Sequence, residues 1–87
     1  MAWTDGMSGG EHIFEWARNT QSLYRRMLRV RVPGNFVTVG RQAAEALDVA
    51  RSSLADMRRA NESPSGTYDA RDVLQAALLF LEWNGED

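Results

Sequence analysis

VGRQAAEALDVARSSLADMRRA, residues 39–60, is the stretch from which we predict the fold. Ala44 is small, as is needed where two helix backbones approach closely, and apolar residues follow it at helical spacing. This pattern suits two short helices that cross at a tight turn. We therefore predict a helix-turn-helix over about residues 40–60. The residues expected to be buried between its two helices are Leu47, Val49, Leu54 and Met57.

The polar side of the second predicted helix is rich in arginine and serine. Such a face can enter a DNA major groove, whose base edges offer hydrogen-bond acceptors to these side chains. Asp56 lies on the same side, and its negative charge disfavours the binding of a polyanion such as DNA. We expect Arg41 and Arg59 to contact phosphates and the others to contact bases or their surroundings. The candidate DNA-binding residues are Arg41, Arg51, Ser52, Ser53, Arg58 and Arg59.

The longer run TVGRQAAEALDVARSSLADMRRANESPSGTYDARDVLQAALLFLE, residues 38–82, resembles the winged helix-turn-helix of MerR-type regulators and excisionases, and also that of phage-terminase small subunits. These proteins place a helix-turn-helix first, then a short wing closed by an aromatic residue, then an acidic cap that opens a further helix. Here GTYDARDVLQ (66–75) matches the last two parts. The resemblance also places the turn of the helix-turn-helix at Asp48, where the families usually have glycine and where Asp tolerates a left-handed backbone. Wings of these families usually carry basic residues, whereas NESPSGTY (61–68) carries none.

This resemblance implies a mainly α fold with little strand and an added N-terminal helix. It also implies sequence-specific binding of double-stranded DNA, as a small transcription regulator or as an excisionase, that is, a recombination directionality factor, of a phage or mobile element. The alternative is a protein-binding module, such as an antiactivator or a phage-encoded inhibitor, that keeps the fold without the basic wing. The net charge of −2 and Asp56 favour this alternative.

Capping signals place the other helices. We expect a flexible start over residues 1–9 and a single helical domain over residues 10–87. Ser8 and Glu11 form a capping-box pattern, which predicts one helix over residues 10–30. Pro33 and Gly34 indicate a linker before the helix-turn-helix. Asp69 is expected to cap a last helix that extends to about Trp83 and stops at Asn84-Gly85.

The last predicted helix is apolar almost all the way round in LQAALLFLEW, residues 74–83. A helix in a small domain has one core to face, so residues on its other side need a second cover. Either the N-terminal helix supplies that cover or a second subunit does. We predict a homodimer with two-fold symmetry through this helix.

Composition limits the function further. The chain has 87 residues and no cysteine, and nine of its ten basic residues, all arginines, lie within residues 18–61. His12 is the single histidine and lacks partners at ligand spacing, so we expect a surface residue and no metal. No catalytic constellation is present, and we expect neither an enzyme nor a cofactor. Without a signal peptide or a membrane-spanning run, the sequence predicts a cytoplasmic protein.

Overall fold

The computed structural model describes residues 6–30 and 38–83, which form four α-helices and one short 3-10 helix. In chain order they are α1 (Gly9–Arg18), α2 (Gln21–Val30), α3 (Thr38–Arg59), η1 (Ser65–Thr67) and α4 (Ala70–Glu82). Within these ranges there is no strand. The fold is therefore mainly α, as predicted.

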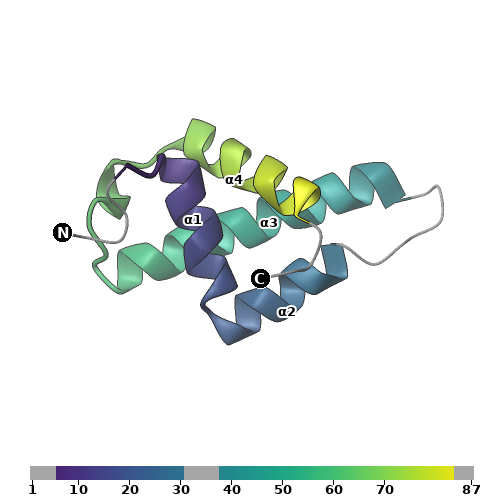
Figure 1. Ribbon diagram of the computed structural model, residues 1–87, viewed down its shortest axis with the longest axis horizontal. Helices are drawn as coiled ribbons and strands as arrows, with labels where there is room; N and C mark the ends of the chain where they lie inside the picture. The colour runs from purple at the N-terminus through teal and green to yellow at the C-terminus, as the bar shows by residue number, and fades with distance from the viewer. Residues whose placement is uncertain (1–5, 31–37, 84–87) are drawn as a thin grey trace.

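Helix α3 forms the long axis of the molecule (Figure 1). Helices α4 and α2 lie along it, and α1 crosses it while packing on α4 as well. All four helices contribute to one apolar core, which includes Ile13, Met27, Met57 and Phe80. Leu54 and Met57 are buried, as the sequence predicted. Ala44, in contrast, is exposed, and Ala46 and Ala50 are the small buried residues of α3.

The predicted turn at Asp48 is absent, because α3 continues without a break from Thr38 to Arg59. Between residues 41 and 59 the sequence has neither glycine nor proline and is rich in alanine, so no strong helix breaker interrupts α3. The Asp48 carboxylate is held in mid-helix by Arg26, whose Nη2 lies 2.6 Å from Oδ2. The helix-turn-helix expected over residues 40–60 is therefore replaced by one helix.

Two helices stand where one was predicted over residues 10–30. The side-chain amide of Asn19 donates to the Glu15 carbonyl at 2.8 Å, and the Thr20 hydroxyl donates to the Trp16 carbonyl at 2.8 Å. These bonds satisfy the carbonyls that a continuing helix would have used. The chain turns at this point, which allows α2 to pack along α3.

The predicted caps are confirmed at the N-terminal ends of α1 and α4. Ser8 and Glu11 form a capping box at α1, and Asp69 and Asp72 form one at α4. α4 ends at Glu82 with Trp83 as its cap, close to the prediction. The linker expected at Pro33-Gly34 and the stop at Asn84-Gly85 lie outside the described residues.

The segment between α3 and α4 contains a 3-10 turn where a wing was predicted. Asn61 adopts a left-handed backbone (φ 56°) and ends α3, while the Glu62 amide bonds to the Met57 carbonyl at 2.9 Å. Ser65–Thr67 then forms η1, and the half-buried Tyr68 packs against the core. The segment gains its order from these turn bonds, since no strand forms between residues 60 and 69.

Candidate functional site

The predicted DNA-binding residues of α3 lie on two different sides of the helix. Ser53 is fully buried, and its Oγ donates to the Ile13 carbonyl of α1 at 2.8 Å. It is a core residue that joins two helices, so it does not belong to the exposed face. Ser52 is half-buried. The exposed candidates are Arg41, Arg51, Arg58 and Arg59.

The side of α3 nearest α2 is engaged within the molecule. Arg26 of α2 donates from Nη1 to the Ser52 hydroxyl at 2.9 Å and from Nη2 to the Asp48 carboxylate at 2.6 Å. Because Asp48 is largely exposed, this ion pair adds little to stability. Its effect is to orient these three side chains toward one another.

Asp56 connects the C-terminal half of α3 to α1. Its Oδ2 accepts a hydrogen bond from the Trp16 indole at 2.9 Å, and its Oδ1 lies 3.1 Å from Arg59 Nη2. The indole hydrogen bond, helped by Arg59, holds the pKa of the Asp56 carboxyl below its usual range. The sequence placed Asp56 on an exposed face, and the structure shows it as an anchor for Trp16.

A groove lies between α3 and the first turns of α4. Apolar side chains form most of it, with a volume of about 350 Å³. Arg51 and Arg58, both exposed, contribute charge at the α3 side. The groove is lined by Leu47, Arg51, Leu54, Ala55, Arg58, Asp69, Ala70 and Val73.

The one carboxylate that lines the groove offsets the positive charge of its arginines only in part. Asp69 is its single carboxylate, and both of its oxygens are engaged with Arg71 or the backbone amides at the start of α4. These bonds, the Arg71 amide first, lower the pKa of the Asp69 carboxyl. Arg58 donates to the Tyr68 carbonyl at 2.8 Å. Within the described residues, no carboxylate lies within 4 Å of the Arg51 or Arg58 guanidinium.

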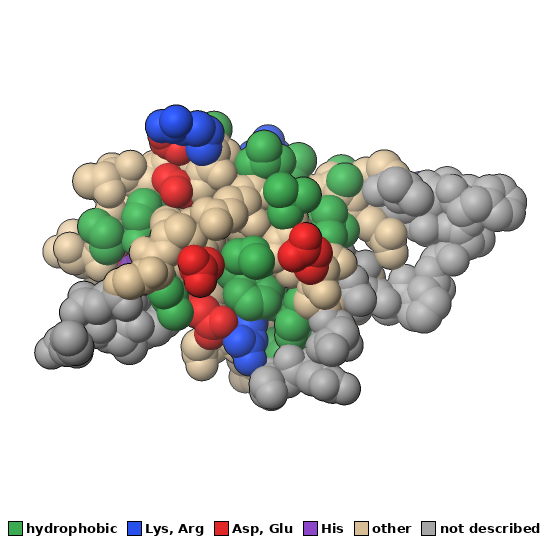
Figure 2. Space-filling view, turned by 45° about the horizontal axis from the view of Figure 1, so that its top comes forward, with side chains coloured by type: hydrophobic (Ala, Val, Ile, Leu, Met, Phe, Trp, Pro, Cys, Tyr) green, Lys and Arg blue, Asp and Glu red, His purple; other side chains and the backbone are tan. Residues whose placement is uncertain are grey.

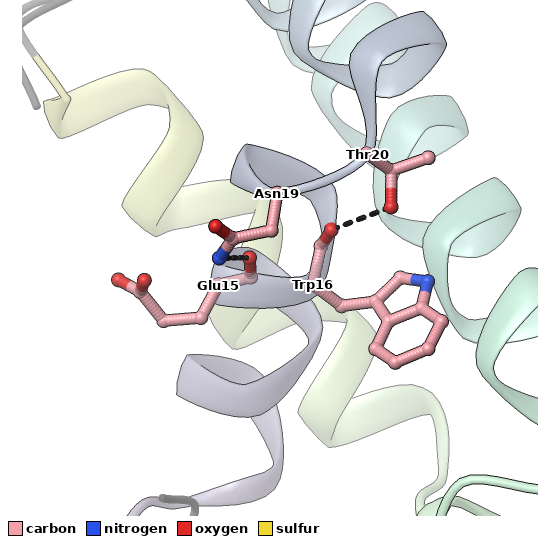
Figure 3. A pocket seen from close by; sticks show the side chains of 4 residues that line it. All are labelled: Glu15, Trp16, Asn19 and Thr20. Atoms are coloured by element: carbon pink, nitrogen blue, oxygen red, sulfur yellow. Dashed lines mark hydrogen bonds between the residues drawn. The ribbon is translucent and has the colours of Figure 1, made fainter.

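A second hollow lies at the junction of α1 and α2 (Figure 3). Glu15, Trp16, Asn19 and Thr20 line it, with a volume of about 500 Å³. Its polar groups are already bonded: Asn19 and Thr20 to backbone carbonyls, and the Glu15 carboxylate to Arg18 at 2.7 Å. This hollow therefore lacks an obvious group for binding a charged ligand or for catalysis.

His12 is fully buried, which corrects the prediction of a surface histidine. Its Nδ1 is 2.7 Å from the Tyr68 hydroxyl, and its Nε2 is 3.6 Å from Glu62 Oε1. Burial lowers the pKa of His12 despite the opposing effect of Glu62, and burial raises the pKa of Tyr68. Reasoning from sequence missed this cluster because Tyr68 follows His12 by 56 residues.

Among residues 6–30 and 38–83, no group of three or more His, Cys, Asp or Glu residues is arranged to hold a metal ion. No helix in this part of the chain is long and apolar enough to cross a membrane. The chain matches no protein-family model, no curated protein and no solved structure.

Proposed function

We propose that this chain is a protein-binding module that holds an amphipathic helix of a partner in the groove between α3 and α4. The observation that carries this proposal is the combination of an apolar groove with two exposed arginines at its α3 side. Amphipathic helices bind such grooves through apolar residues that recur every three or four positions. The mainly α fold, with α3 as one rigid helix under the groove, supports this mode of binding.

The two arginines also favour a particular partner charge. Arg51 and Arg58 are seven positions apart on α3, and two helical turns separate them by about 10.5 Å along the axis. Acidic side chains spaced by two turns on the partner would meet both guanidinium groups. Asp69 would not oppose them strongly, because its carboxylate is already bonded to the start of α4. The expected partner helix is apolar on one face and acidic along its edge.

Filling the groove is expected to abolish this binding. A displayed library of helical peptides, apolar on one face, would be selected on the wild-type protein. Ala55 is exposed and lines the groove, so Ala55→Trp adds bulk there without disturbing the core. We expect the selected peptides to lose at least about tenfold in affinity, about 1.4 kcal/mol, on this variant.

Ala44→Trp is the matched control for this experiment. Ala44 is also exposed on α3 but lies three turns from Ala55, outside the groove. The same peptides should bind this variant as they bind wild type, and circular dichroism should show both variants folded. Peptides that bind all three proteins equally, or a selection that yields no peptide, would exclude the groove as the binding site.

DNA binding is the second candidate function, and the exposed arginines of α3 favour it. Arg41, Arg51, Arg58 and Arg59 are all at the surface. Burial of Ser53 removes one of the predicted base contacts, and the ion pair of Arg59 with Asp56 competes with one of the predicted phosphate contacts. In this proposal the arginines contact phosphates and bases of double-stranded DNA. The chain would then act as a small transcription regulator or as an excisionase.

Salt dependence tests the DNA-binding proposal. Each phosphate that an arginine neutralises releases counterions, so binding to a mixed-sequence duplex should weaken steeply as salt rises. Loss of the phosphate contact predicted for Arg41, in Arg41→Ala, should reduce the salt slope by about one. Arg25→Ala, an exposed arginine on α2, serves as the control. If wild type binds no duplex at low salt, DNA binding is excluded and the groove proposal is unaffected.

A further inference from the structure

Helix α4 presents a row of side chains to solvent on the side away from the core. Leu74 and Leu78 are each 52% exposed, although both are large and apolar. Arg71 and Glu82 are also exposed and lie at the two ends of the same row. The spacing 71, 74, 78, 82 keeps these residues on one face of the helix. We call this row the α4 stripe.

Figure 2 shows apolar side chains gathered over α4, on the face turned toward the viewer. α1 and α3 pack against the other sides of α4, and Phe80 points into the core. The helix α1 therefore supplies much of the second cover that the apolar sequence of α4 required. Leu74 and Leu78 are the large apolar residues of α4 that remain more than half exposed.

The α4 stripe is complementary to itself. In a two-fold dimer, if a residue of the first copy contacts a different residue of the second, the same contact occurs again with the two copies exchanged. The midpoint between Arg71 and Glu82 and the midpoint between Leu74 and Leu78 differ by half a residue, about 0.75 Å along the helix. An antiparallel pair of α4 helices therefore aligns the leucines with each other and brings each Arg71 to the opposite Glu82.

We infer that the occupant of the α4 stripe is a second copy of this chain, paired with the first as antiparallel α4 helices. The two leucines of each copy bury one another at the centre, and two Arg71–Glu82 pairs close the ends. Arg71 exchanges its exposed contact with Asp69, at 3.3 Å, for the partner's carboxylate. The stripe shares no residue with the α3/α4 groove, so this inference does not depend on the proposed function.

Contact through a single helix pair is small, at the low end of interface sizes, so the dimer is expected to be weak and to dissociate on dilution. Sedimentation velocity of the wild-type chain over a range of concentrations measures this directly. A dimer that forms reversibly with rising concentration is the expected result. A monomer at every concentration up to about 1 mM, the weak end of specific affinities, would overturn the inference.

Charge reversal tests which residues of the two α4 helices lie opposite each other, that is, the register of the pair. R71E places like charges opposite each other at both ends of the dimer, and so does E82R, so each variant alone should dissociate about tenfold more easily than wild type. An equimolar mixture of the two variants restores opposite charges at both ends, and the mixed dimer should regain the wild-type affinity. Neither change should unfold α4, because acid near its start and base near its end both suit the helix dipole.

Matched variants separate the effect of the register on dimerisation from the effect of net charge. Arg25→Glu on α2 and Glu45→Arg on α3 change the net charge equally at exposed sites outside the stripe, and they should dimerise as wild type does. Leu78→Gln should weaken the dimer, while Leu28→Gln, at an exposed leucine of α2, should not. Unchanged dimerisation of R71E and E82R, or a mixture no stronger than either variant, would overturn the pairing of α4 helices.

Discussion

Replacing Phe80 with alanine is expected to lower the free energy of unfolding by about 3 to 5 kcal/mol. Phe80 is fully buried, and its ring packs against that of Phe14, with the centroids 5.4 Å apart. The substitution removes most of a large side chain at the place where α1 meets α4, and the helices on either side prevent the cavity from closing. A domain of this size has only about 5 to 10 kcal/mol of stability, so half of it would be lost.

Leu78→Ala on the same helix is the control. Leu78 is more than half exposed, and its truncation should cost less than about 1 kcal/mol in the monomer. Urea unfolding of both variants and of wild type, at a concentration where the chain is monomeric, gives the comparison. Equal midpoints for the two variants would mean that α4 is rotated about its axis relative to the structure described here.

The same pair of residues shows what the sequence could predict about α4. Its start was predicted correctly, because Asp69 and Asp72 bond to backbone amides close by in the chain, and its end at Glu82 is close to the prediction. Its inward face was not, since leucine and phenylalanine occupy consecutive positions in residues 78–81 and periodicity cannot rank them. Only the positions of α1 and α3 decide that Phe80 is buried and Leu78 is exposed.

Two errors have a common physical origin. The turn at Asp48 was expected from a resemblance to helix-turn-helix proteins, although residues 41–59 contain no glycine or proline to break a helix. The second error was to place Ser53 on the exposed face. Because α3 is continuous, Ser53 faces α1, and its hydroxyl donates to the Ile13 carbonyl. The groove could not have been predicted, as it joins residues of α3 and α4 that only the tertiary packing brings together.

Acidification from about pH 7 to about pH 5 is expected to destabilise the folded chain through His12. This side chain is fully buried, and burial lowers its pKa below the ordinary value of 6.5. The unfolded chain therefore binds the proton at a higher pH than the folded chain does. Stability is greatest above pH 6.5 and falls as the pH drops below it, by at most about 1.4 kcal/mol per pH unit for one group.

The charges around His12 oppose this effect without reversing it. Glu62, from the segment after α3, lies 3.6 Å from Nε2 and favours the protonated ring. Tyr68 bonds to Nδ1 at 2.7 Å. Burial, together with the charges of Asp72 and Glu62, raises the pKa of Tyr68, so the hydroxyl stays neutral over this range. Desolvation of the buried ring outweighs the attraction of a carboxylate that is itself partly exposed.

His12→Gln isolates the effect, because His12 is the single histidine and glutamine keeps an amide close to the Tyr68 hydroxyl. Denaturant unfolding of wild type and variant at several pH values should give a falling stability for wild type and a nearly flat profile for His12→Gln. Asp56 and Asp69, whose pKa values are lowered, lose their contributions only below about pH 4, outside this window. Should wild type become more stable on acidification, the Glu62 carboxylate would be outweighing burial, and His12 would be a charged partner in the core.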